Sequence, residues 1–264
     1  MDRRITGWAL LADAIPFYPL YALFFADSGM SAAEIAALLA IWSVTGLVAE
    51  VPSGALSDRF SRRRVLAAGG LLQAAAYAVW LLAPSFAGFA VGFVLWGIGT
   101  SLYSGTVEAL AYEGLAAVGA QDRYATLRGH VTAAGHAGQI PAAFAATALV
   151  ATGGYPLVGW VSVGICLAGA LLTWTFPDPP RTADPDGEDE DLGYFATLRS
   201  GLGEAVGSRV VRGALVAAAL VAGIDALEEF YPLIVGESAE VTLAAVPVVL
   251  LVVTVALPGL GRPR

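Results

Sequence analysis

The chain has 264 residues, of which 57 % are hydrophobic and 14 % are charged, and its mean hydropathy is +0.71. A water-soluble domain of this length cannot bury so much apolar surface, so the composition excludes that class and indicates an integral membrane protein. The formal net charge is −8 and comes mostly from one acidic segment, so the charge does not point to a nucleic-acid partner.

Eight apolar segments are long enough to cross a membrane as helices, which takes about 20 residues each. They lie at about 5–26, 34–57, 65–83, 86–108, 126–150, 155–176, 210–233 and 241–258. The sequence therefore predicts an all-α integral membrane protein. No small-residue cleavage site follows the first segment, so we expect an uncleaved first helix rather than a signal peptide.

The basic residues, all of them arginines, fall in alternate connections between these segments. They precede the first segment, follow the eighth, and lie between the second and third, fourth and fifth, and sixth and seventh. Basic residues accumulate on the cytoplasmic side of a membrane. We therefore expect a multi-pass protein of the cell (plasma) membrane with a cytoplasmic N-terminus.

The first segment carries Asp13, and Phe17-Tyr18-Pro19-Leu20 follows it. A carboxyl group at membrane depth costs about 2.5–3.5 kcal/mol on insertion scales, so it needs water or a partner. We expect Asp13 to face a cavity and, with Tyr18, to contact a substrate or a proton. The alternative is an acid near the cytoplasmic third of the helix that reaches water directly.

The second segment ends in Glu50-Val51-Pro52-Ser53 and continues as Gly54-Ala55-Leu56-Ser57-Asp58-Arg59-Phe60-Ser61-Arg62-Arg63-Arg64. Gly54 and Ser57 are spaced so that a neighbouring backbone could approach closely. The run resembles the signature of the major facilitator superfamily (MFS) of secondary transporters: Gly, x, Leu, small, Asp, Arg, x, Gly, Arg, Arg/Lys. Ser61 stands where that signature has its second Gly. The resemblance implies the fold of the protein but does not indicate which solute it transports.

The resemblance implies an MFS-type helical bundle with twelve helices in two halves. Residues 1–176 would form the six-helix N-terminal half, and residues 210–264 the first two helices of an incomplete C-terminal half. Residues 177–209, rich in proline and acid, would be a cytoplasmic linker with a short amphipathic helix. On this interpretation the chain looks truncated after its eighth helix.

The resemblance also implies a cytoplasmic gate. Its residues would be Gly54, Asp58, Arg59, Arg62, Glu50 and Glu108, with Asp58 meeting the N-terminus of a helix in the opposite half. The arginines would pair with Asp58, Glu50 or lipid phosphates. A plain positive-inside anchor is the alternative, which we favour for Arg63 and Arg64.

Two further polar sites lie in apolar segments. His136 and Gln139 are three residues apart and share a helix face, so they could bind substrate or a proton, although a structural histidine is equally consistent. Asp225, Glu228 and Glu229 also share a face. They could bind a cationic group, carry a proton or form a solvated outer gate.

Phe230-Tyr231-Pro232-Leu233 repeats Phe17-Tyr18-Pro19-Leu20, and each copy follows an acid. Four identical residues at equivalent depth predict a parallel repeat of two halves, with bending points at the aromatic-proline pairs. The remaining aromatic residues are spread in the manner of interface belts.

The function that we predict is alternating-access transport of a small organic solute. Efflux is the role implied by the resemblance to bacterial family members, and proton coupling remains open. The alternative is a non-transporting remnant or membrane partner subunit. An enzyme is not expected, because intramembrane protease motifs such as His-Glu-x-x-His are missing. No cofactor or metal is expected, and the partners are the lipid bilayer, the solute and, as an open alternative, protons.

Overall fold

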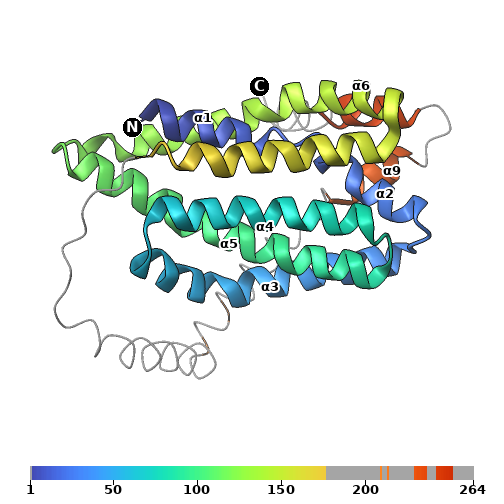
Figure 1. Ribbon diagram of the computed structural model, residues 1–264, viewed down its shortest axis with the longest axis horizontal. Helices are drawn as coiled ribbons and strands as arrows, with labels where there is room; N and C mark the ends of the chain where they lie inside the picture. The colour runs from blue at the N-terminus through green and yellow to red at the C-terminus, as the bar shows by residue number, and fades with distance from the viewer. Residues whose placement is uncertain (1, 177–208, 210–212, 214–228, 237–241, 252–264) are drawn as a thin grey trace. The chain divides into compact units, whose positions relative to one another are not determined.

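The computed structural model describes residues 2–176, 209, 213, 229–236 and 242–251 (Figure 1). The chain divides into two units, Met1–Asp178 with Pro232–Arg264, and Pro179–Tyr231. The first unit contains all the long helices that the structure describes. The expected acidic linker and its amphipathic helix lie outside the described residues.

The long helices of the first unit follow the apolar segments of the sequence. Their bounds are α1 Asp2–Asp13, α2 Tyr21–Asp27, α3 Ala32–Arg59, α4 Arg62–Leu82, α5 Phe86–Ala116 and α6 Tyr124–Thr173, with 3-10 turns η1 Tyr18–Leu20 and η2 Gln121–Arg123. By length and composition, five stretches of these residues could cross a membrane. The predicted all-α membrane fold is confirmed for this part of the chain.

The first apolar segment is broken rather than continuous. Pro16 and Pro19 each lack the N–H that an α-helix needs, so α1 ends at Asp13 and the chain passes through η1 before α2 begins. The backbone N–H of Phe17 donates instead to Ser162 Oγ on α6, at 3.0 Å in a buried position. A neighbouring helix thus satisfies a backbone group that the break sets free.

The connection after α3 is much shorter than hydropathy suggested. Helix α3 continues to Arg59 and α4 begins at Arg62, so only Phe60 and Ser61 lie between them. The prediction ended the helix at residue 57 and restarted it at 65, because hydropathy marks where a helix leaves hydrocarbon. A helix can continue for several residues into water after it has left the hydrocarbon layer.

Helix α6 contains both the fifth and the sixth predicted segments. Gly154 interrupts it with φ +61° and ψ −164°, a backbone conformation that favours glycine. This break falls in the predicted gap between residues 150 and 155. The seventh and eighth segments are described only in part, by α9 Tyr231–Gly236 and η4 Leu243–Ala245.

Both copies of the Phe-Tyr-Pro-Leu repeat lie where a 3-10 turn precedes an α-helix. In the first copy η1 leads into α2, and in the second the turn at residues 229–230 leads into α9. Proline in the first turn of a helix costs no hydrogen bond, which explains the shared local structure.

Helix α5 packs between α3 and α4, while α6 packs on α1 and α4 (Figure 1). A dense aromatic core joins α2, α4 and α5 toward the end of the unit that holds the α4–α5 connection. Its members are fully buried or nearly so: Tyr21, Phe25, Trp80, Phe89 and Phe93. Trp80 Nε1 donates to the Phe89 carbonyl at 3.1 Å, which fixes the indole in this core.

Candidate functional site

A cavity of about 510 Å³ lies inside the first unit, among α1, α3, α4, α5 and α6. This volume is within the range of small-molecule binding sites. The polar and aromatic residues that line it are Trp8, Asp13, Tyr18, Trp42, Gln73, Tyr77, Trp96, Thr100, Tyr103, Ser104, Glu108, Arg128, Thr132, His136 and Gln139. Five of the residues predicted from sequence therefore meet in one cavity: Asp13, Tyr18, Glu108, His136 and Gln139.

Asp13 reaches the cavity because α1 ends there. Asp13 is exposed, and His136 of α6 lines the same cavity. Helix α6 comes very close at this point: a Cβ at Gly135 would lie 2.2 Å from Asp13 Oδ2, and one at Gly138 would lie 2.2 Å from the Leu10 carbonyl oxygen. Two glycines on α6 thus make room for α1 and its carboxylate.

Polar side chains follow the inner faces of two helices at four-residue spacing. On α5 the series is Trp96, Thr100, Ser104 and Glu108, and on α6 it is Arg128, Thr132 and His136. Four residues return a helix to nearly the same face. With a rise of 1.5 Å per residue, the α5 series spans about 18 Å of the cavity.

An ion pair joins the last residue of the α5 series to the first residue of the α6 series, near the α5–α6 connection. Arg128 Nη2 lies 2.7 Å from Glu108 Oε1, and both side chains are partly exposed. Glu50 on α3 takes part in the same wall, since its Oε1 accepts a hydrogen bond from Ser104 Oγ at 2.7 Å. The sequence predicted both Glu108 and Glu50 as gate residues. It did not predict Arg128 as the partner of Glu108.

Several of the aromatic residues line the cavity and contact one another. Trp42 stacks on Trp96 with ring centroids 5.5 Å apart, and Tyr18 meets Trp96 edge-on at 6.0 Å. The Trp8 ring meets Tyr103 edge-on at 4.9 Å. Trp8 Nε1 is buried with no hydrogen-bond partner among the described residues, which leaves an indole donor at the cavity wall.

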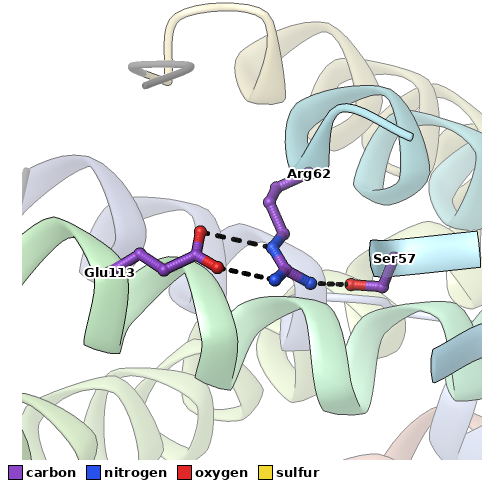
Figure 2. A network of polar contacts seen from close by, with 3 residues as sticks. All are labelled: Ser57, Arg62 and Glu113. Atoms are coloured by element: carbon purple, nitrogen blue, oxygen red, sulfur yellow. Dashed lines mark hydrogen bonds and ion pairs between the residues drawn. The ribbon is translucent and has the colours of Figure 1, made fainter. Parts of the chain in front are cut away.

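The arginine-rich connection carries a second polar network, drawn in Figure 2. Arg62 Nη2 lies 2.6 Å from Glu113 Oε1 on α5, and a second guanidinium nitrogen donates to Ser57 Oγ on α3. Arg62 and Ser57 are buried. The sequence predicted Asp58, Glu50 or lipid as partners of the arginines. The structure adds for Arg62 a carboxylate 51 residues away, which the sequence did not predict.

The other predicted residues are placed as follows. Gly54, Asp58 and Arg59 lie in the last turns of α3, and Arg59 is exposed. The close approach expected at Gly54 is not made by any described residue, because a Cβ there would meet no atom within 4 Å. Asp225 and Glu228 lie outside the described residues, and Glu229 is half-buried in the second unit.

Some cavity residues could have been found from sequence. Arg128, Thr132 and His136 lie at four-residue spacing within or beside an apolar segment, which is a sign of a polar helix face. Trp42 and Trp96 carry no such sign, because tryptophans also occur in cores and at membrane interfaces.

Comparison with known proteins identifies the family. The family model described as Major Facilitator Superfamily matches residues 5–262. The chain belongs to the Major Facilitator Superfamily. It is thus a multi-pass membrane protein of a family of transporters rather than enzymes.

Two curated relatives from strains of Mycobacterium tuberculosis, each named an uncharacterized MFS-type transporter, are 33 % identical to this MFS chain over 180 residues. The match covers 67 % of this chain and 40 % of each relative. Among solved structures, a crystal structure of a D-xylose-proton symporter aligns with a TM-score of 0.57 and 16 % identity. This alignment covers 96 % of this chain and 64 % of the symporter chain. The similarity supports the MFS fold. The chain thus spans less than two thirds of the length of the proteins that it matches.

Proposed function

We propose that this MFS protein is a secondary active transporter of a small organic solute, which binds in the cavity around Asp13 and is moved by alternating access. The cavity carries the proposal: Asp13 at the end of α1 and His136 with Gln139 on α6 come from two apolar segments far apart in sequence and line one space. Polar side chains at such depth are costly unless they meet water or a ligand. The family and the names of the curated relatives support transport as the activity.

We further propose that the protein lies in the cell membrane with its N-terminus and the Arg59–Arg64 region in the cytoplasm, and that it works in efflux. The alternation of arginines along the sequence supports this orientation. Single cysteines at Ser61 and Ser28, in a Cys166→Ser background, test it with an impermeant thiol reagent. Labelling of Ser61→Cys from outside intact cells would contradict the orientation.

Reconstitution tests transport itself. Proteoliposomes holding the whole protein are loaded with a panel of organic solutes, and efflux and uptake are followed with and without a proton gradient. Flux above that of protein-free liposomes, lost in Asp13→Asn, is the expected result. No flux with any solute, together with stable association with another membrane protein, would favour the alternative of a non-transporting partner subunit.

The arginine-rich connection is proposed to act as a cytoplasmic gate, with Gly54, Glu50, Asp58, Arg59, Arg62 and Glu108 as its residues. Asp58→Asn removes the negative charge that this gate needs at the end of α3. We expect flux to fall at least tenfold while the amount of protein in the membrane stays unchanged, because an anion near a helix N-terminus is worth up to about 2 kcal/mol. The matched control is Asp122→Asn in the exposed turn η2. Flux that is equal in the two variants would remove the gating role.

The predicted acids of the seventh segment are proposed as a second polar site. Asp225, Glu228 and Glu229 are replaced singly by the corresponding amides, and uptake is measured across pH. A residue that carries a coupling proton should flatten the pH profile, whereas a solvated gate residue should change the rate at all pH values alike.

A further inference from the structure

We infer that the cavity selects an organic cation with a flat aromatic body. This inference names the solute class and so rests on the proposed transport function. Three features of the cavity support it: a carboxylate at a helix C-terminus, a net negative charge, and a lining of aromatic rings.

The first feature is the position of Asp13 at the end of α1. The C-terminus of a helix carries a partial negative charge, because its last carbonyl groups have no partners within the helix. Ala12, Asp13 and Ile15 all line the cavity, so the end of α1 opens onto it. Asp13 adds a full negative charge where the helix already disfavours one. A bound cation would stabilise both the Asp13 carboxylate and the partial negative charge at the C-terminus of α1.

The second feature is the balance of charges around the cavity. Glu108 and Arg128 neutralise each other at 2.7 Å, and Asp13 remains. The carboxylates of Asp13 and Glu108 and the guanidinium of Arg128 together carry one net negative charge. A monocation would neutralise it, whereas an anion would add a second negative charge to the cavity.

The third feature is the aromatic wall. Rings from four helices and η1 line the cavity: Trp8, Tyr18, Trp42, Tyr77, Trp96 and Tyr103. Trp42 is half-buried and Tyr18 is 41 % exposed, so part of their ring surface is open to a ligand. Ring faces attract organic cations and stack on flat ligands, tryptophan most strongly. A hydrated alkali ion would gain little from such a wall.

Three probes with one ring system test the charge requirement: N-methylquinolinium as the cation, quinoline at a pH where it is uncharged, and quinoline-2-carboxylate as the anion. Binding to the full chain in detergent is measured by calorimetry, with protein-free micelles as background. We expect the cation to bind about tenfold or more tightly than quinoline, because a charge-assisted contact is worth at least about 1.5 kcal/mol. The carboxylate should bind most weakly.

Two pairs of variants locate the site. Asp13→Asn should remove the preference for the cation and leave quinoline binding nearly unchanged, while Asp122→Asn in exposed η2 should keep both. Trp42→Leu should weaken all flat probes, while Trp160→Leu on the exposed surface of α6 should not. Circular dichroism and gel filtration confirm that each variant is folded.

The proposal is overturned if quinoline binds as tightly as N-methylquinolinium, if Asp13→Asn keeps the preference, or if none of the probes binds. These outcomes are distinct from failure of the transport proposal. Flux of uncharged solutes in liposomes without cation binding would leave transport standing and remove only the solute class.

Discussion

The aromatic core and the cavity are built from the same residue types, and Trp96 of the cavity lining contacts Trp80 and Phe93 of the core, yet the two regions differ in what surrounds the rings. In the core, Trp80 is 0 % exposed and packs edge-on against Phe25 at 5.0 Å. In the cavity, Trp42 stacks on Trp96 but is only half-buried, and the same cavity is also lined by Asp13 and His136. Whether a tryptophan serves stability or binding therefore depends on whether its neighbours fill the space around it.

The largest difference should appear when a tryptophan of each region is truncated. Trp80→Ala should lower the free energy of unfolding by about 3–5 kcal/mol, because it leaves a large hole in a close-packed core. Trp42→Ala should cost clearly less, since its ring already borders open space. Thermal unfolding in detergent measures both, and equal losses would contradict the division into core and cavity.

The two glycines on α6 sharpen the comparison where α1 and α6 meet. Gly138→Ala places a methyl group against the Leu10 backbone carbonyl, which cannot move alone, and should cost about 1–3 kcal/mol. Gly135→Ala meets only the end of the Asp13 side chain, which can rotate away. This variant should stay stable but bind N-methylquinolinium more weakly than the wild-type chain.

Stability measurements together with binding measurements separate the two glycine variants. If Gly135→Ala bound the cation as tightly as the wild type, the position of the Asp13 carboxylate would not matter for binding. If Gly138→Ala proved as stable as the wild type, the close approach of α1 to α6 at Leu10 would be in error.

Two ion pairs at the polar ends of the helices, where no ligand is involved, include the variant with the smallest expected effect, Asp2→Asn. Glu113→Gln removes one charge partner of buried Arg62 and should cost about 1–3 kcal/mol at most, because the carboxylate itself is 40 % exposed. Asp2→Asn breaks the exposed Arg123–Asp2 pair at 3.2 Å and should cost less than about 1 kcal/mol. A larger loss in Asp2→Asn than in Glu113→Gln would reverse our ranking of the two pairs.

The sequence by itself determined the membrane class, the first six apolar segments and the gap between residues 150 and 155 in which the break at Gly154 falls, because each rests on local composition. It also identified Asp13, His136 and Gln139, since a polar group in an apolar segment is conspicuous wherever the helix lies. The family signature at Gly54–Arg64 could be read for the same reason, as an order of residue types along the chain.

Only the tertiary structure decided which aromatic rings fill a core and which line a cavity, and which carboxylate meets Arg62. Glu113 is 51 residues from Arg62 in the sequence. Trp42 on α3 stacks on Trp96 of a different helix, α5. Such contacts depend on the rotation and tilt of whole helices. The rotation and tilt of each helix are set by its packing against all of its neighbours. Aromatic rings that pack together contribute to this, and so do glycines such as Gly138, where the backbone of another helix can approach closely.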